Sequence, residues 1–424
     1  MDIKIPYGND RLELSLDGLS VELLQSSIQD LQSDQTDDKL VLEAMAHPLG
    51  SVTLREMAVG KHTATIIISD HTRPVPSRHI IPFMLAELRA GSHDIDITLL
   101  VATGFHRGTK KEELISKLGE KIVQEERIIV HDCQDDSANI EIGILPSGAK
   151  LVVDRCAIET DILVSEGFIE PHFFAGFSGG RKSVLPGVCS RMTVLGNHCS
   201  KFIASPYART GVLENNPIHK DMVAAARMAG LRYIVNVIIN EHKEVVAAFA
   251  GDPIVAHEAG CTLLKDYCHV KPQRLGDIVI SSNGGAPLDQ NIYQSVKGLT
   301  AAESAAAPDA ILIMCTRCND GTGGDDFYHA LRDCKSPAIL LSEVSRVPMN
   351  ETRPDQWEYQ ILARVLSKHR TIFVSDPKMQ TTLEEMKLEY AETVQEALIR
   401  ALKSIEKDAH VVIIPDGVSV IVEK

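Results

Sequence analysis

Short runs of apolar, mostly β-branched residues recur along the chain, and a polar loop and a helical pattern follow most of them. The runs are almost continuously apolar, as expected of strands that are buried on both faces of a parallel sheet. They cover residues 64–69, 96–103, 161–167, 233–240, 277–284, 310–315, 338–342, 371–375 and 411–417. Helical patterns lie between them at 216–230, 253–266, 289–306 and 390–405. This alternation predicts an α/β fold of mainly parallel sheets with helices on both faces.

The stretch HVKPQRLGD at 269–277 is typical of a linker, because it is basic, contains proline and glycine, and precedes a fresh strand. A chain of 424 residues is also too long for one ordinary hydrophobic core. We therefore predict two α/β domains, residues 1–272 and residues 273–406. The last strand pattern suits either domain, and we assign it, with about residues 407–424, to the first.

The composition narrows the class of protein. Hydrophobic residues make up 44% of the chain and charged residues 24%, as in soluble globular proteins. The formal net charge of −15 disfavours nucleic acid as the main partner, because phosphate groups require a basic surface. No stretch is long and apolar enough to span a bilayer, and no secretory signal is recognisable, so we expect no membrane partner. The odd number of nine cysteines favours a reducing compartment and predicts a cytoplasmic protein.

Polar motifs follow several of the predicted strands. They are SDHTRP (69–74), GFHRGT (104–109), EGFIEPH (166–172) and SSNGG (281–285). In parallel α/β sheets, ligands bind beyond the carboxyl ends of the strands. The motifs carry histidine, aspartate, arginine and glycine, so we expect them to form one composite site.

The first two motifs each allow a functional and a structural interpretation. Asp70 can bind a ribose hydroxyl, and Arg73 can form a two-pronged bond to a carboxylate or phosphate. The alternative is a turn stabilised by the aspartate beside a surface arginine. His106 can act as a general acid or base, but a single loop histidine is more often structural.

The segment 165–198 contains a glycine-rich loop, GFSGGRKS, that resembles a phosphate-binding loop but places Arg181 where that motif requires glycine. Glycines still let backbone N–H groups approach an anion. Burial beside Arg181 would lower the pKa of Lys182 and favour nucleophilic chemistry. The alternative is a glycine-rich turn with a solvated basic pair. Further along, His198 with Cys189 and Cys199 nearby could bind a borderline metal, although the spacing fits no structural zinc site.

The predicted helix at 289–306 places an amide, a phenol and an ammonium group on one face, through Tyr293, Gln294 and Lys297. An ordinary exposed helix face is the alternative. Trp357, the single tryptophan, is either a core anchor or a residue that covers the site.

The ensemble of motifs resembles the nickel-dependent lactate racemase family over essentially the whole chain. The resemblance is carried by SDHTRP, ATGFHR, EPHFFAGFSGGRKSVLPG, GNH and YQSVKG, in this order. It implies two α/β domains with the active site in the cleft between them. It also implies a nickel-pincer nucleotide, in which a nicotinate-derived mononucleotide holds nickel through sulfur substituents and a pyridinium carbon.

The resemblance assigns roles to individual residues. It implies that Lys182 tethers the cofactor covalently, that His198 is the protein ligand of nickel, and that His106 and His172 are the paired acid–base residues. The remaining roles that it implies are nucleotide binding by Asp70, Thr72 and Gly176, and substrate binding by Arg73, Tyr293, Gln294, Lys297 and Trp357.

The expected function is therefore racemisation or epimerisation of a 2-hydroxy acid by reversible hydride transfer, because direct removal of the α-proton beside a carboxylate is difficult. Its partners would be the small-molecule substrate and the enzymes that synthesise the cofactor. A sugar or sugar-acid epimerase with the same cofactor is an alternative, since His71 and Arg107 leave room for a more polar substrate. An NAD-type dehydrogenase is disfavoured because no G-x-G-x-x-G follows an early strand. A non-catalytic cofactor carrier would need no acid–base pair.

Overall fold

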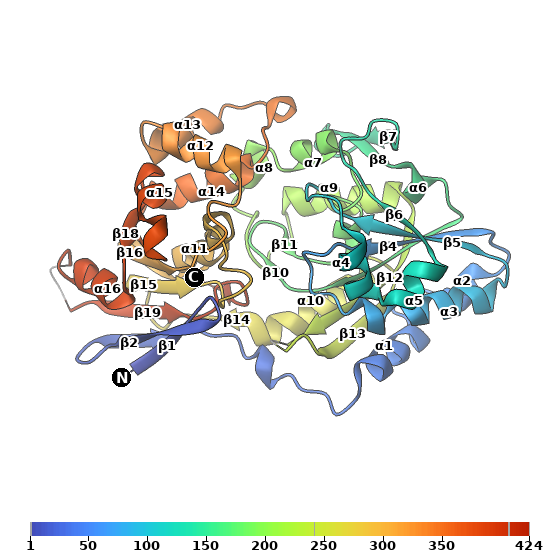
Figure 1. Cartoon of the computed structure of the whole chain (residues 1–424), viewed down its shortest axis with the longest axis horizontal. Coiled ribbons are helices and arrows are strands. Elements are labelled where there is room, and N and C mark those ends of the chain that lie inside the picture. The colour runs from blue at the N-terminus through green and yellow to red at the C-terminus, as the bar shows by residue number, and fades with distance from the viewer. Residues whose placement is uncertain (1, 241, 406–407, 424) are drawn as a thin grey trace.

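We describe a computed structural model of the chain that covers residues 2–240, 242–405 and 408–423. It contains two six-stranded sheets that lie side by side and are covered by helices (Figure 1). The first sheet has the strand order β13-β12-β9-β4-β5-β6 and is parallel except for β13. Its strands are β4 (Thr63–Ser69), β5 (Asp96–Ala102), β6 (Arg127–Val130), β9 (Ile162–Phe168), β12 (Leu231–Ile239) and β13 (Val245–Gly251).

The second sheet has the order β18-β17-β16-β15-β19-β3 and is parallel throughout. Its strands are β3 (Ser20–Leu23), β15 (Gly276–Ser282), β16 (Ala306–Cys315), β17 (Arg370–Val374), β18 (Glu389–Ala391) and β19 (His410–Ile414). The smaller ribbons pair β1 (Asp2–Tyr7) with β2 (Asp10–Ser15), β7 (Asn139–Ile144) with β8 (Lys150–Asp154), β10 (Pro171–His172) with β11 (Gly176–Phe177), and β14 (His269–Val270) with β20 (Ile421–Val422).

Ten α-helices accompany the first sheet and six accompany the second, within the described residues. The first group is α1 (Asp37–Ala46), α2 (Leu54–Ala58), α3 (Ile81–Gly91), α4 (Lys111–Leu118), α5 (Glu120–Glu125), α6 (Arg155–Ile158), α7 (Arg191–Asn197), α8 (Ser200–Ile203), α9 (Pro217–Met228) and α10 (Val255–Cys268). The second group is α11 (Ile292–Ala305), α12 (Asp325–Asp333), α13 (Pro337–Val344), α14 (Gln356–Leu366), α15 (Gln380–Glu385) and α16 (Val394–Leu402). Among the helices described, none has the length and hydropathy needed to cross a membrane.

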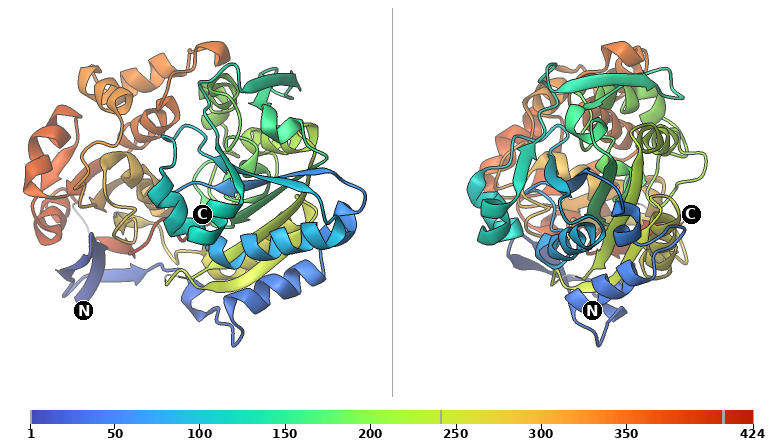
Figure 2. Two further views of the ribbon diagram at one scale, coloured as in Figure 1. Left: turned by 45° about the vertical axis from the view of Figure 1, so that its right-hand side comes forward. Right: turned by 90° about the vertical axis from the view of Figure 1, so that its right-hand side faces the viewer.

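The central strands are apolar throughout because both of their faces are buried. In β4, Ile66 and Ile68 join the core formed with helices α1–α3, whereas Ile67 joins the core on the other face, formed with α9. In β15, Ile280 packs towards α16 and the β1–β2 hairpin, and Val279 packs towards α11. The alternation of side chains along a strand thus sends neighbouring residues into different cores, and Figure 2 shows helices on both sides of each sheet.

One apolar core continues from the first domain into the second. It includes Leu163 and Phe173 from the first domain and Val296, Leu312 and Trp357 from the second. Helix α14 packs against α8 of the first domain as well as against α11 of its own domain, and Gln360 of α14 donates a hydrogen bond of 3.0 Å to the carbonyl oxygen of Ser200. The two domains therefore meet through packed side chains as well as through the linker.

The strand predicted at 338–342 was wrong, because these residues form helix α13. A short apolar run cannot be assigned by periodicity alone. Here Ser336 supplies the N-cap, with its hydroxyl accepting from the N–H of Ile339 at 3.3 Å, and Pro337 occupies the first turn. Both features favour the start of a helix.

The last strand also lies elsewhere than predicted. Strand β19 pairs with β15 and β3 in the second sheet, so assigning it to the first domain was wrong. Strand β3 belongs to the second sheet too, although it lies within the range 1–272. Ile421, beyond β19, returns to pack with Ile169 and Phe177 of the first domain. The boundary near residue 272 stays a prediction.

Asn216 connects the start of α9 to two neighbouring loop segments of the first domain, so its substitution tests how these segments are held together. Its buried side chain caps α9 by accepting from Ile218 N at 3.0 Å, and it donates to the carbonyl oxygens of Phe174 at 2.8 Å and Val212 at 3.0 Å. Asn216→Ala leaves these buried groups without partners, so we expect a loss of about 2–4 kcal/mol in the free energy of unfolding. Denaturant titration measures this loss.

Thr36→Ala is the matched control, because Thr36 caps α1 at an exposed site with a single contact of 3.4 Å to Lys39 N. This variant should lose only about 0.5–1 kcal/mol in the free energy of unfolding. Equal losses in the two variants would contradict the role given to Asn216.

Candidate active site

Three neighbouring strands of the first sheet end at the same edge and carry the candidate polar residues. Asp70 follows β4, His106 follows β5, and His172 lies shortly after β9. The carboxyl ends of adjacent parallel strands lie side by side, which is where ligands bind in such folds.

Asp70 and His106 form a hydrogen-bonded pair. The carboxylate accepts from Nδ1 of His106 at 2.7 Å and from the hydroxyl of Thr72 at 2.7 Å. Burial raises the pKa of Asp70, but bonding to His106 and Thr72 and the charge of Arg73 outweigh it, so the pKa lies below its usual value. Because an ionised carboxylate can only accept, the proton of a neutral His106 ring lies on Nδ1 and the lone pair lies on Nε2.

Hydrogen bonds from neighbouring elements hold the loop that carries Asp70. Buried Glu166 of β9 accepts from the backbone N–H of Ser69 at 3.1 Å and from the hydroxyl of Ser77 at 2.7 Å. The ammonium of Lys117 donates to the carbonyl oxygen of Arg73 at 3.1 Å. These contacts hold both ends of the SDHTRP turn, so Asp70 points towards His106 without help from a ligand.

His172 presents the opposite tautomer. Its Nδ1 accepts from the backbone N–H of Ala175 at 3.3 Å, which places the proton of the neutral ring on Nε2. Burial lowers the pKa of His172 well below its usual value, and the charges of Lys182, Lys297 and Arg73 lower it further. The ring therefore remains neutral at neutral pH.

Lys182 lies in a short 3-10 turn, Gly180–Ser183, with its Nζ 5.8 Å from the centroid of the Phe174 ring. Burial lowers the pKa of its ammonium well below the usual value, and the charges of Arg181 and Arg73 act in the same direction. A lysine with a lowered pKa offers more of the neutral amine, which is the nucleophilic form.

Arg181 is fully buried, so a solvated basic pair was the wrong alternative for this residue. Its guanidinium donates to the carbonyl oxygens of Ala175 at 2.7 Å and Phe177 at 2.8 Å, and its Nε donates to Nδ1 of His219 at 3.0 Å. Burial lowers the pKa of Arg181 to about 10, and it remains a cation at neutral pH. The hydrogen bonds of Arg181 therefore hold the glycine-rich segment in a fixed conformation, and this conformation positions Lys182.

The glycine at position 176 has a structural explanation. Its φ is +82°, and a Cβ atom there would lie 2.5 Å from the carbonyl oxygen of Val212. The close approach of these two chain segments already excludes a side chain. A contact of Gly176 with a cofactor stays a prediction.

His198 ends α7 and has one ring nitrogen available. Its Nδ1 donates to the carbonyl oxygen of Val194 at 3.0 Å, which leaves the Nε2 lone pair free, and burial lowers the pKa of the ring to about 3. This is the usual arrangement of a metal-binding histidine, whose other nitrogen donates to a backbone carbonyl. Burial raises the pKa of the Cys189 and Cys199 thiols, which makes them poor ligands at neutral pH.

No cluster of three or more His, Cys, Asp or Glu side chains that could hold a metal occurs in the described part of the chain. A single histidine does not retain a transition metal by itself. Any metal at His198 would therefore need its other ligands from a bound group, and the donor set here fits a cofactor that brings them.

The second domain contributes residues on one face of α11 and at the start of α14 to the candidate site. Trp357 donates from Nε1 to the hydroxyl of Tyr293 at 3.0 Å, and its ring lies 5.0 Å from that of His198. The buried Oε1 of Gln294 has no hydrogen-bond partner among the described residues. Trp357 is thus both a core residue and a wall of the site.

A small, partly open cavity of about 20 Å³ lies between the domains. His172, Glu170 and Thr210 line it from the first domain, and Lys297 and Val418 line it from the second. Sequence reasoning missed Glu170, whose negative charge favours the ammonium forms of Lys182 and Lys297. Its position beside His172 in the EPHFF motif was the available signal.

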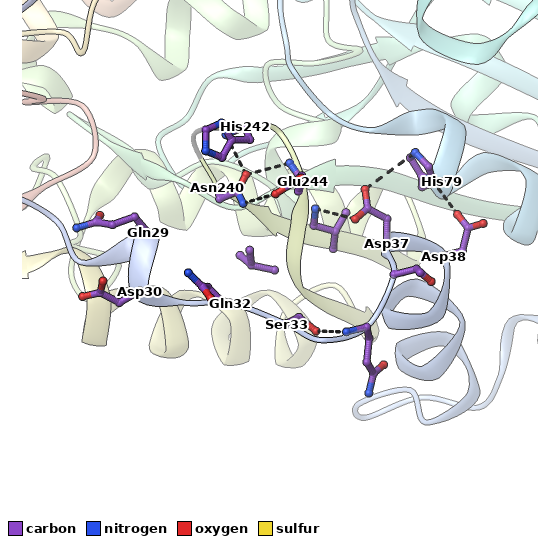
Figure 3. A pocket seen from close by; sticks show the side chains of 14 residues that line it. Gln29, Asp30, Gln32, Ser33, Asp37, Asp38, His79, Asn240, His242 and Glu244 are labelled. Atoms are coloured by element: carbon purple, nitrogen blue, oxygen red, sulfur yellow. Dashed lines mark hydrogen bonds and ion pairs between the residues drawn. The ribbon is translucent and has the colours of Figure 1, made fainter.

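A second pocket lies on the surface between the N-terminus of α1 and the turn from β12 to β13 (Figure 3). Two of its acidic side chains are already engaged, because Asp38 pairs with His79 at 2.7 Å and Asp37 accepts from Val245 N at 3.2 Å. No predicted site residue lines this pocket.

The interdomain site as a whole combines the imidazoles of His106 and His172 with three basic side chains, Arg73, Lys182 and Lys297. Aromatic rings form part of its wall, with centroids 4.5 Å apart for His172 and Phe174 and 5.9 Å apart for Phe105 and Trp357. Such a site attracts a small anion and can move protons at fixed ring nitrogens.

Comparison with known proteins identifies relatives for the entire chain. Residues 7–211 match the lactate racemase N-terminal domain family, and residues 271–422 match the lactate racemase C-terminal domain family. A lactate racemase of Thermoanaerobacterium thermosaccharolyticum is 47% identical over 425 residues, which is 100% of this chain and 99% of that protein. A lactate racemase of Lactiplantibacillus plantarum is 47% identical over 422 residues, 99% of each.

Solved structures agree with the architecture. The structure of the lactate racemase apoprotein from T. thermosaccharolyticum superimposes with a TM-score of 0.96 at 46% identity and covers 100% of both chains. A crystal structure of a Thermotoga maritima protein superimposes with a TM-score of 0.65 at 18% identity, over 92% of this chain and 100% of that one, and shows similarity of fold alone.

The Asp70–His106 pair leads to a prediction about the ring tautomer. In the wild type, long-range ¹H–¹⁵N spectra should show neutral His106 protonated at Nδ1. Asp70→Asn replaces a carboxylate, which can only accept, by an amide that can either accept from or donate to Nδ1, so we expect a mixture of both tautomers. An unchanged Nδ1-protonated ring in the Asn variant would contradict the proposed pairing, and Asp94→Asn, at an exposed site, serves as the control.

Proposed function

The chain belongs to the lactate racemase family and is an isomerase, and we propose that it interconverts the enantiomers of lactate or of a similar 2-hydroxy acid. The observation that supports this function most strongly is the pair of histidines with opposite tautomers. The neutral ring of His106 exposes a lone pair on Nε2, and that of His172 exposes a proton on Nε2. His106 can accept a proton at Nε2, and the Nε2–H of neutral His172 can donate a hydrogen bond to an oxygen, so the two rings offer complementary groups to a hydroxy acid.

We propose that Lys182 and His198 hold a nickel-pincer nucleotide. The lowered pKa of Lys182 supports its role as the covalent tether, and the free Nε2 of His198 supports its role as the protein ligand of nickel. When bound, this group supplies a reversible acceptor for the hydride at the substrate's chiral carbon. Asp70 and Thr72 bond to each other and to His106, so in this structure they position the acid–base residue, and any contact of theirs with the nucleotide would be additional.

The remaining site residues would bind and orient the substrate. Arg73 and Lys297 attract its carboxylate, and the amide of Gln294, whose buried Oε1 has no partner among the described residues, is available for a further polar contact. Removal of the hydroxyl proton by a histidine occurs beside these cations, which favour the negative charge that develops on oxygen. The anchored carboxylate keeps the molecule in the site while its two faces exchange.

The contacts of His71 and Arg107 favour a small substrate over a sugar acid. Nδ1 of His71 lies 3.1 Å from the hydroxyl of Thr109, and the guanidinium of Arg107 forms an ion pair with Glu113. These polar groups are therefore already engaged. A cytoplasmic location and delivery of the cofactor by its synthesis enzymes remain part of the proposal.

The proposed tether predicts a covalent adduct. Protein produced together with the cofactor-synthesis enzymes should carry extra mass on the peptide that contains Lys182, and it should racemise lactate in chiral chromatography. Lys182→Ala should lose both the adduct and the activity. Nickel-loaded, active protein without a lysine adduct would exclude this mode of attachment.

The acid–base pair predicts a large kinetic effect. Replacing either His106 or His172 by Ala should lower kcat for racemisation by about 10²–10⁴-fold, the usual contribution of a general acid or base. His93→Ala is a suitable control, because this side chain is 97% exposed. Activity within about twofold of the wild type in both site variants would rule out the proposed roles.

A further inference from the structure

The C-terminal segment that follows β19 crosses from one domain to the other. Strand β19 belongs to the second sheet, whereas Ile421 packs with Ile169 and Phe177 of the first domain. Between these two points, Gly417 and Val418 line the interdomain cavity. The segment therefore forms one wall of the cleft, and none of the roles described above involves it.

A close contact holds this segment against the first domain. Gly211 has a φ of +75°, and a Cβ atom there would lie 2.7 Å from Cγ2 of Ile421. Thr210, the residue before Gly211, lines the cavity as Val418 does. Two segments that are far apart in the sequence thus lie side by side at the same wall, and their tight packing limits how far either can move.

Val418 differs from the apolar residues that follow it. Val420 belongs to the core that continues between the domains, and Ile421 belongs to the core that contains Phe177. Val418 is half-buried and belongs to none of the apolar clusters among the described residues. An apolar residue that lines a cavity and takes no part in a core is available to contact a ligand.

Most other residues that line the cavity serve different purposes. His172 and Lys297 have proposed roles in the reaction, and Phe173 belongs to the core between the domains. Gly417 has no room for a side chain, because a Cβ atom there would lie 2.8 Å from Cα of Gly298. Few residues can therefore set the size of the cavity, and the C-terminal segment supplies one of them.

The cavity is small enough to select by size. Its volume of about 20 Å³ is little more than a single water molecule requires. In a 2-hydroxy acid, the carboxylate and the variable substituent are bonded to the same carbon atom. A carboxylate held by Lys297 would therefore bring the substituent against the other residues that line this cavity. A methyl group suits such a space, whereas a longer chain requires the wall to yield.

We propose that Val418 is a specificity-determining residue that restricts the substituent of the substrate to a methyl group, so that lactate is preferred over longer 2-hydroxy acids. This inference rests on the proposed function, because it assumes a 2-hydroxy acid whose carboxylate binds Lys297. The selection is steric. A longer substituent would have to displace Val418, and the packing of Ile421 against Gly211 opposes that displacement.

The first test compares two substrates in the holoenzyme. Val418→Ala removes two methyl groups from the wall, so kcat/KM for 2-hydroxybutyrate relative to lactate should rise about tenfold. Val418→Thr keeps the branched shape and should keep this ratio within about twofold of the wild type. Chiral chromatography measures both reactions. A ratio in Val418→Ala that equals the wild-type ratio would overturn the proposal.

Val422→Ala is the matched control, because it makes the same change in the same segment. Val422 pairs with Val270 and packs against the core between the domains, and it does not line the cavity. This variant should have a lower melting temperature and an unchanged substrate ratio. An equal rise of the ratio here would show that loosening the segment, and not the size of Val418, causes the effect.

A binding measurement examines the cavity without the reaction. Propionate, butyrate and valerate carry the carboxylate but no hydroxyl group, and isothermal titration calorimetry follows their binding to the full-length protein without cofactor. The wild type should bind propionate most tightly, and Val418→Ala should bind butyrate and valerate about tenfold more tightly than the wild type does. The same dependence on chain length in both proteins, or saturable binding to neither, would overturn the proposal.

The outcomes separate this inference from the proposed function. A holoenzyme that racemises lactate, with the same substrate ratio in the wild type and in Val418→Ala, would overturn the role of Val418 alone. A wild-type holoenzyme that is inactive on every 2-hydroxy acid would overturn the proposed function, and the calorimetric series would still decide whether Val418 sets the size of the cavity.

Discussion

The burial of Lys182 and Lys297 together in one cleft with Arg73 is the constraint on which the site depends. Burial lowers the pKa of His172, Lys182 and Lys297, and the charges of Arg73 and of the lysines lower the pKa of His172 further, as Arg73 does for both lysines. Like charges in a poorly solvated region favour the loss of protons. Burial and the shared positive charge together keep His172 neutral and make Lys182 more nucleophilic, and the positive charge favours an anionic ligand.

This concentration of charge requires a rigid scaffold, because flexible side chains would simply turn towards water. Arg181 supplies part of it by bonding to the carbonyl oxygens of the loop that presents Lys182. Glu166 holds the neighbouring turn, which carries Asp70. Sequence patterns suggest that charged groups such as Arg181 and Glu166 are solvated. In the structure they are buried and hold the loops of the site in place.

The second domain completes the site through one pair of helices. Helix α11 provides Lys297 to the cavity and Gln294 beside it, while α14 places Trp357 against His198 and Tyr293. Since α14 also packs on α8 of the first domain, the aromatic wall and the interdomain contact are parts of one structure. Movement between the domains would therefore alter the site itself.

The sequence by itself determined the fold class, most of the strands and the family, because these depend on local periodicity and on motifs that are continuous along the chain. It predicted that Asp70, His106 and His172 follow buried strands. It could not determine that 338–342 is helical, because five apolar residues suit either structure until Ser336 and Pro337 are considered. Only the tertiary structure placed β19 beside β3, since His410 and Ser20 pair across almost the whole chain. Only it decided which ring nitrogen of each histidine carries the proton and which residues line the interdomain cavity, because both depend on atoms brought together by folding.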